Sequence, residues 1–190
     1  DLFHSCRLRE VADAIHWLYQ DWQRKNSEQS PVFLAGFSLG GNFALRVALQ
    51  APELGTELSR VIAVCPPIKP ANVLTALEQG PSIYERYFCD KWRRSLRRKQ
   101  NLFPQRYFLE EWFKIGSLRE QTQYLVDHYT DFPDIQDYLN GYSVGENALA
   151  PLRVPTTIVT AADDPVVPVT DFYALPRSDY LEVQIEAAGG

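Results

Sequence analysis

The sequence contains no methionine and only three cysteines, which are Cys6, Cys65 and Cys89. An odd number of cysteines without a Cys-x-x-Cys pair predicts neither a disulfide framework nor a zinc site, and it favours a reducing, cytoplasmic setting. No apolar stretch approaches the roughly 18 residues that a membrane-spanning helix needs. These absences argue against a disulfide-stapled scaffold and against a membrane-spanning helix within residues 1–190.

Basic residues are also in the minority. The chain has 19 Lys and Arg against 24 Asp and Glu, and its net charge is −5. A negative net charge repels polyanions, so it does not favour nucleic acid or an anionic membrane as the main partner. The sequence implies no metal ion and no organic cofactor.

The bulk composition is that of an ordinary globular protein, with 45% apolar and 23% charged residues. A length of 190 residues fits one domain. The chain begins with Asp1 rather than Met and stops at Gly189-Gly190, directly after a predicted strand. We therefore expect residues 1–190 to be part of a longer domain that is cut at both ends.

The first third of the chain alternates between helical and strand patterns. Apolar residues at steps of three and four predict an amphipathic helix over 5–25. A continuous apolar run over 31–37 predicts a strand buried on both faces, as in parallel sheets. A helical pattern follows Ser38 and ends at Pro52, and a second buried strand is predicted over 60–65. This alternation is typical of an α/β protein with a doubly wound parallel sheet.

The stretch over 68–150 has helical patterns and no evident strand. It is too long for a simple connection, so we expect an inserted helical cap over the carboxyl edge of the sheet. The sheet resumes with strands predicted over 156–161 and 180–185. We expect most cap aromatics to form core between helices and some to line an acyl pocket. These aromatics are Tyr84, Tyr87, Phe88, Trp92, Phe103, Tyr107, Phe108, Trp112 and Phe113.

The segment Gly36-Phe37-Ser38-Leu39-Gly40 lies between a predicted strand and a predicted helix, the context that a nucleophile elbow requires. There the serine occupies a strained turn, and small neighbours such as Gly36 and Gly40 let the backbone cross itself. The N–H of Leu39 is placed to bind a developing oxyanion. The alternative is a serine that only caps a helix in a glycine-rich turn.

The acid of such a triad follows the serine along the chain and precedes the histidine. Asp163 and Asp164 end the strand predicted over 156–161. We expect Asp164 to orient the imidazole, with Asp163 as the second choice. The alternative is that both cap a helix beginning near Pro165.

None of the three histidines stands in the expected order. His4 and His16 precede Ser38, and His128 precedes the acid. Each is therefore expected to have a structural or surface role. The catalytic histidine is expected just beyond Gly190, which would leave this chain inactive by itself.

The motifs resemble those of the YheT-like hydrolases and their eukaryotic relatives among the α/β-hydrolase domain proteins. The resemblance rests on Gly-Phe-Ser-Leu-Gly-Gly-Asn at 36–42 and Ala-Asp-Asp-Pro at 162–165. Cap segments over 125–130 and 136–139 are similar to an Asp-x-x-Thr element and an Asp-Tyr-Tyr element of that family. The sequence departs from the family in having Tyr-Leu in the latter element and Phe37 where Tyr or His is frequent.

The resemblance covers most of the chain and implies an α/β-hydrolase fold. It also implies an esterase or lipase that acts on carboxylic esters through a Ser-Asp-His triad. Family chains carry earlier strands and a His-Gly oxyanion loop before the point where this chain begins, and a Gly-Gly-His segment where it stops.

One locally basic run, over 91–99, interrupts the acidic composition. Its usual meaning is a solvated helix face. Contact with a lipid headgroup or an anionic interface is the sharper hypothesis, and nucleic-acid binding is less favoured than either.

The sequence as a whole predicts a serine hydrolase acting on a small-molecule or lipid ester. The alternatives are a non-catalytic binding protein that kept the fold and an acyltransferase, which has the same motif.

Overall fold

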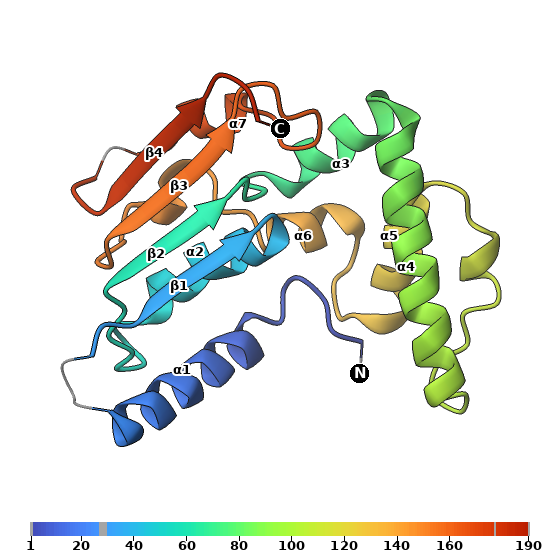
Figure 1. The fold of residues 1–190 in the computed structure, drawn as a ribbon. Helices are drawn as coiled ribbons and strands as arrows, with labels where there is room; N and C mark the ends of the chain where they lie inside the picture. The colour runs from blue at the N-terminus through green and yellow to red at the C-terminus, as the bar shows by residue number, and fades with distance from the viewer. Residues whose placement is uncertain (1, 27–29, 177, 190) are drawn as a thin grey trace.

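The computed structural model describes residues 2–26, 30–176 and 178–189 (Figure 1). Its four strands form one parallel sheet in the order β1-β2-β3-β4. The strands are β1 (Phe33–Phe37), β2 (Arg60–Val64), β3 (Thr156–Ala161) and β4 (Leu181–Glu186). Parallel neighbours need a crossover connection, and helical segments supply it between successive strands. The predicted α/β class is confirmed.

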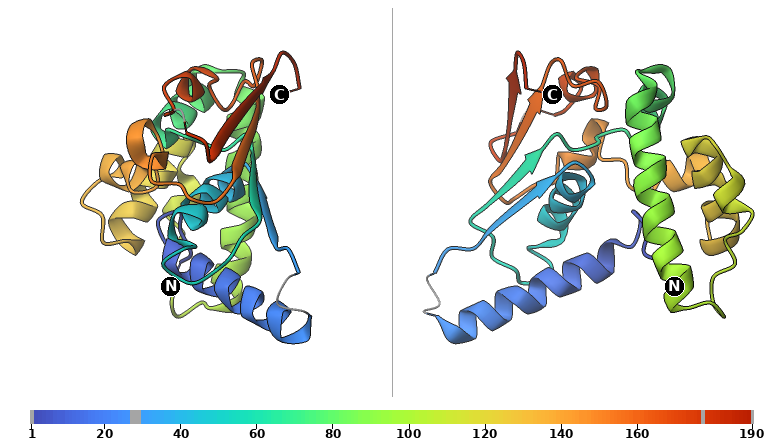
Figure 2. Two further views of the ribbon diagram at one scale, coloured as in Figure 1. Left: turned by 90° about the vertical axis from the view of Figure 1, so that its left-hand side faces the viewer. Right: turned by 45° about the vertical axis from the view of Figure 1, so that its right-hand side comes forward.

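Three helices belong to the sheet layer: α1 (Leu8–Lys25), α2 (Leu39–Gln50) and α7 (Thr170–Tyr173). Helix α2 packs against β1 and β2, and α1 packs against α2 (Figure 2). The middle of α2 is fully buried because its apolar residues lie between the sheet and α1. This packing fixes the amino end of α2 directly after β1.

The remaining helices gather beyond the carboxyl ends of the strands, as Figures 1 and 2 show. They are α3 (Pro70–Gln79), α4 (Ser82–Leu102), α5 (Leu118–Tyr129) and α6 (Ile135–Asn140), with 3-10 turns at Trp112–Lys114 and Glu146–Leu149. We call α3 to α6 the cap. No strand occurs in the described backbone over 68–150, in agreement with the helical pattern of the sequence.

The expectation that the first strand is buried on both faces is wrong. The Phe33 and Phe37 side chains on β1 are 63% and 74% exposed. Successive side chains of a strand point to opposite faces, and α2 covers only one of them. Because β1 also has β2 as its single partner among the described strands, it forms an edge of the sheet.

The first helix begins at Leu8 rather than at Ser5, because contacts with the cap hold the preceding residues in a turn. The Ser5 backbone N–H donates to the Tyr138 hydroxyl at 3.3 Å, and this hydroxyl donates to Ser5 Oγ at 3.1 Å. The Cys6 thiol donates to the carbonyl of Tyr138. These contacts join the start of the chain to α6.

Two boundaries near the other end also differ from expectation. The last strand is Leu181–Glu186, one residue later than predicted. No helix begins near Pro165, since α7 starts at Thr170. The reading of the aspartate pair as caps of a helix at Pro165 is therefore wrong.

The nine cap aromatics differ in exposure, and Trp92 and Phe113 are half-buried. Trp112 and Tyr107 are buried, and the Trp112 indole N–H donates to the carbonyl of Gln121 at 2.9 Å. Five others are exposed, contrary to the expectation of a mainly buried set: Tyr84, Tyr87, Phe88, Phe103 and Phe108.

Among the described residues, no helix combines the length and apolarity that a membrane span needs.

Candidate active site

Ser38 lies between β1 and α2 in a strained backbone conformation, with φ 48° and ψ −123°. A residue with a Cβ rarely adopts positive φ, because the side chain crowds the backbone, at a cost of about 1–3 kcal/mol. The Ser38 N–H donates to the carbonyl of Val64 at 2.8 Å, which ties the turn to β2. The turn is therefore held by the sheet and leaves the serine exposed.

Gly36 is required by the crossing of the backbone at this turn. A Cβ there would overlap the carbonyl of Gly40 and lie 2.7 Å from the nitrogen of Gly41. Gly41 is also tight, with its Cβ position 3.1 Å from the carbonyl oxygen of Gly36. Gly40 differs from the expectation, because a Cβ on it would meet no atom within 4 Å and its φ is not positive.

Leu39 is the first residue of α2, so its N–H has no acceptor within the helix. Unpaired amides at a helix start attract negative charge, and the helix dipole adds to this effect. The Ser38 side chain stands at the same end of α2. The position suits an oxyanion donor next to the serine.

Asp164 follows β3 and is half-buried. Its Oδ1 accepts the backbone N–H of Val166 at 2.8 Å and that of Val167 at 3.0 Å. Two such bonds fix the direction of the carboxylate. Because β2 separates β1 from β3, the ends of the strands that precede Ser38 and Asp164 are about 10 Å apart. This span leaves room for an imidazole with a hydrogen bond at each nitrogen.

The Asp163 side chain has a different hydrogen-bond partner from that of Asp164. Its side chain is exposed, and its Oδ1 accepts the backbone N–H of Gly189 at 3.0 Å. The two neighbouring aspartates thus have different partners, as adjacent side chains at a strand end are expected to have.

The histidines within the described residues do not bond to the serine or to either aspartate. His16 Nδ1 lies 2.8 Å from Thr56 Oγ1, and His128 Nδ1 lies 2.8 Å from the carbonyl of Tyr124. The His4 ring packs edge-on against Tyr138, and burial lowers its pKa. All three have the local roles expected of them.

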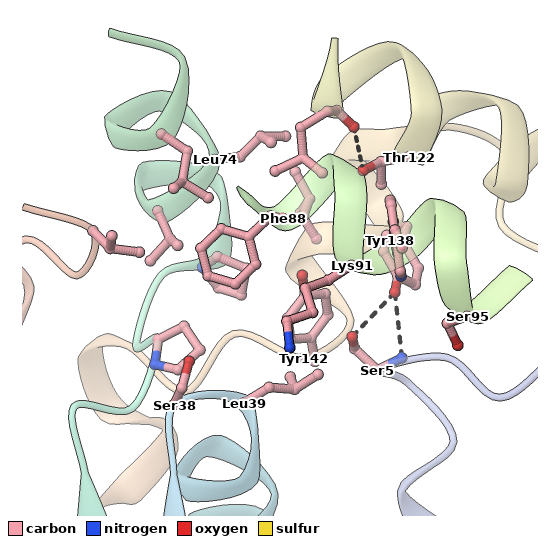
Figure 3. A pocket seen from close by; sticks show the side chains of 18 residues that line it. Ser5, Ser38, Leu39, Leu74, Phe88, Lys91, Ser95, Thr122, Tyr138 and Tyr142 are labelled. Atoms are coloured by element: carbon pink, nitrogen blue, oxygen red, sulfur yellow. Dashed lines mark hydrogen bonds between the residues drawn. The ribbon is translucent and has the colours of Figure 1, made fainter. Parts of the chain in front are cut away.

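Ser38 and Leu39 form part of the wall of a cavity of about 430 Å³ between α2 and the cap (Figure 3). Most of the lining is apolar, including Leu74, Leu77, Leu139 and Val166. Phe88 and Lys91 contribute from α4, and Lys91 is the one charged residue among the described residues that line the cavity. A volume of this size is typical of a small-molecule site.

Among the described residues, no group of three or more His, Cys, Asp and Glu side chains is placed to hold a metal ion. The polar side-chain groups that line the cavity are hydroxyls, the Lys91 ammonium and the Trp92 indole N–H.

A family model described as alpha/beta hydrolase fold matches residues 5–176. The chain belongs to the α/β-hydrolase fold family. The match spans β1 to β3, α2 and the cap, and it includes the strand–serine–helix turn described above.

Two curated relatives share the family. YheT of Escherichia coli, named as a candidate esterase, is 23% identical over 189 residues, which cover 97% of this chain and 52% of that protein. RutD of Azorhizobium caulinodans, named as a candidate carbamate hydrolase, is 29% identical over 149 residues, which cover 71% of this chain and 49% of that protein. This α/β-hydrolase chain therefore spans about half the length of the curated relatives it matches.

A solved structure agrees on the fold. The rice cell wall degrading esterase LipA of Xanthomonas oryzae matches with a TM-score of 0.55 at 15% identity, covering 98% of this chain and 59% of that chain. At this identity the likeness concerns the fold alone.

Cys65 is a residue of this α/β-hydrolase site that the sequence did not indicate. It follows β2, between the strands that carry Ser38 and Asp164, and its φ is 45°. Burial raises the pKa of the thiol, and the charge of Asp164 raises that pKa further. The thiol therefore stays protonated at neutral pH and does not compete as a nucleophile. A cysteine directly after a buried strand and before Pro66 is the only signal in the sequence.

Asn42 connects α2 to the two segments that flank the cap. Its fully buried side chain donates to the carbonyl of Pro67 at 3.0 Å and to that of Tyr142 at 2.8 Å, and it accepts from Arg46 at 3.3 Å. Arg46 in turn donates to the carbonyl of Ser5 at 2.7 Å. One amide thus connects α2, the segment after β2 and the segment after α6.

We expect Asn42→Ala to lower the free energy of unfolding by about 3 kcal/mol, because it leaves two buried carbonyls and one arginine without a partner. Urea unfolding of the variant and the parent measures the loss. Asn101→Ala, at an exposed position on α4, is the matched control and should change stability by less than about 0.5 kcal/mol. Equal effects of the two substitutions would contradict the role of Asn42.

Proposed function

We propose that the protein is a carboxylic-ester hydrolase in which Ser38 is the nucleophile and Asp164 is the triad acid. The observation that carries the proposal is the strained Ser38 turn, which presents a hydroxyl to an apolar cavity at the amino end of α2. Fluorophosphonate labelling of the full-length protein, with and without Ser38, tests it.

In the proposed reaction, Ser38 Oγ attacks the ester carbonyl and its proton passes to a histidine. The carbonyl oxygen becomes negative and accepts the N–H of Leu39, and one such donor contributes about 3 kcal/mol to lowering the barrier. The alcohol leaves with the proton from the imidazole. Water, deprotonated by the same imidazole, then attacks the acyl-enzyme and releases the carboxylic acid.

The proposed base is a histidine outside residues 1–190, since His4, His16 and His128 have other partners. Asp164 would accept a hydrogen bond from the Nδ1–H group of that histidine and stabilise its charged form.

The lining of the cavity favours an ester with an apolar acyl or alcohol group. A second, apolar cavity of about 220 Å³ shares several lining residues with the first, among them Leu39, Trp92 and Thr122. An apolar chain extending from Ser38 would gain about 0.8 kcal/mol for each buried methylene.

The two aspartates provide a paired test of the triad acid. We expect Asp164→Asn to reduce ester hydrolysis by the full-length protein about 10⁴-fold, because an amide cannot stabilise the imidazolium and favours the wrong tautomer. Asp163→Asn keeps the amide oxygen that the Gly189 N–H needs, and we expect activity within about threefold of the parent. A larger loss from Asp163→Asn would transfer the role to Asp163.

A further inference from the structure

The positive charge of this acidic chain is concentrated on α4. Over Ser82–Leu102 the helix carries seven basic and two acidic residues, whereas the whole chain has a net charge of −5. Within the described part of the chain, Lys91, Arg94 and Arg98 form no ion pair with a carboxylate, whereas Arg93 pairs with Asp90 at 3.5 Å. The positive charge of the helix is therefore largely directed to solvent.

The outward face of α4 combines cations with apolar side chains. Tyr87, Lys91, Arg94 and Arg98 follow one another at steps of four, three and four, so they lie along one face. The helix is buried on the other side, at Cys89 and Leu96. We call the face formed by Ile83, Tyr84, Tyr87, Lys91, Arg94 and Arg98 the α4 surface.

The apolar members lie at the beginning of the helix. Ile83 is 69% exposed and Tyr87 is 53% exposed, and Tyr84 is exposed beside them. The Lys91 ammonium lies 5.3 Å from the centre of the Tyr87 ring. Exposed apolar side chains next to unpaired cations are typical of helices that lie in a lipid interface, where the rings enter the headgroup region and the cations contact anionic lipid.

The α4 surface adjoins the Ser38 cavity. Lys91 belongs to both, and Phe88, one residue from Tyr87, lines the cavity (Figure 3). A lipid layer in contact with α4 would therefore lie next to the cavity that contains Ser38.

We propose that the α4 surface docks on an anionic lipid bilayer. Only α4 is complementary in charge to an anionic surface, because the rest of the chain is acidic. A flat bilayer can contact α4 alone, whereas a polyanion that surrounded the protein would also meet its acidic parts and be repelled by them. Nucleic acid would use the cations without the exposed Ile83 and Tyr87, whereas a bilayer uses both. The delivery of an ester from the bilayer to Ser38 rests on the proposed function, but the docking itself does not.

Vesicle co-sedimentation of the full-length Ser38→Ala variant tests docking independently of hydrolysis. Vesicles of phosphatidylcholine alone are compared with vesicles that contain phosphatidylcholine and phosphatidylglycerol in equal parts. We expect binding to the anionic vesicles only, weakened by added salt. Absence of binding to anionic vesicles, or equal binding to both, would overturn docking without bearing on the esterase proposal, which labelling of the parent protein tests separately.

Two pairs of substitutions locate the surface. We expect Arg94→Glu with Arg98→Glu to weaken binding about 25-fold or more, at about fivefold for each cation lost. Arg9→Glu with Lys25→Glu changes the net charge equally on α1, a separate helix of the sheet layer (Figure 1), and should leave binding within about threefold of the parent. Equal losses in both pairs would show a general charge effect and overturn the assignment to α4.

The apolar residues distinguish lipid from other polyanions. We expect Ile83→Ser with Tyr87→Ser to weaken vesicle binding about tenfold while leaving heparin binding unchanged. Unchanged vesicle binding in this variant, with heparin bound as tightly as vesicles, would identify a polyanion surface and overturn the lipid proposal.

Discussion

Replacement of Ser38 by alanine is expected to abolish fluorophosphonate labelling of the full-length protein and to reduce ester hydrolysis about a millionfold. The turn at Ser38 positions one hydroxyl at the start of α2, and alanine removes the attacking oxygen while leaving the Leu39 amide and the cavity in place. Labelling is followed by mass spectrometry and hydrolysis by release of the acid. Labelling that survives in the variant would place the nucleophile elsewhere.

Ser38→Gly is the companion variant, because it separates catalysis from backbone strain. It should be as inactive as Ser38→Ala but more stable by about 1 kcal/mol, since glycine adopts φ 48° and ψ −123° without steric cost. Chemical denaturation compares the two variants. Equal stabilities would mean that the elbow stores no strain.

Gly36→Ala is expected to lower the free energy of unfolding by about 3 kcal/mol or more and to remove activity with it. The added methyl group would overlap the carbonyl of Gly40, which is backbone and cannot rotate away. The overlap can be removed only if β1 and α2 move apart. This movement would displace Ser38 and the Leu39 amide together. Urea unfolding measures the loss, and ester hydrolysis at low denaturant measures the effect on the site.

Gly40→Ala is the matched control for this substitution. A Cβ at Gly40 meets no atom within 4 Å, and alanine is favoured over glycine in a helix by about 1 kcal/mol. Its stability is therefore expected to equal or slightly exceed that of the parent. If both substitutions were tolerated, the close crossing at Gly36 would not exist in solution.

Helices and strands of this fold could be predicted from the sequence where the local residue pattern determines their boundaries. Thr156–Ala161 has the predicted boundaries, because a short apolar run is bounded by Pro155 and the polar Asp163-Asp164 pair. The exposure of Phe33 and Phe37 could not be predicted, because an apolar run gives no information about which layers cover each face. The start of α1 depends on Tyr138, which is 133 residues away from Ser5 in the sequence.

In the candidate site, too, local features could be predicted from the sequence and features that depend on distant contacts could not. Gly-x-Ser-x-Gly between a strand and a helix predicts a strained turn at Ser38, and the structure contains that turn because the motif is local. The role of Ser38 as a nucleophile stays a prediction. The different roles of Gly40 and Gly41 depend on which backbone atoms cross Gly36, and Cys65 joins the site only through the neighbouring strands. The preference for Asp164 over Asp163 and the expected histidine beyond Gly190 stay predictions, the latter outside the described residues.

The hydrogen bonds of Asn42, together with those between Ser5 and Tyr138, join the sheet layer to the cap at several separate points. A cap fastened in this way cannot swing open about a hinge without breaking buried bonds. The part of the cavity wall that Phe88 and Lys91 contribute would then adjust by side-chain rotation, which takes picoseconds to nanoseconds for exposed residues. The backbone of the cavity would be a rigid frame, and only its side-chain lining would adapt to a substrate.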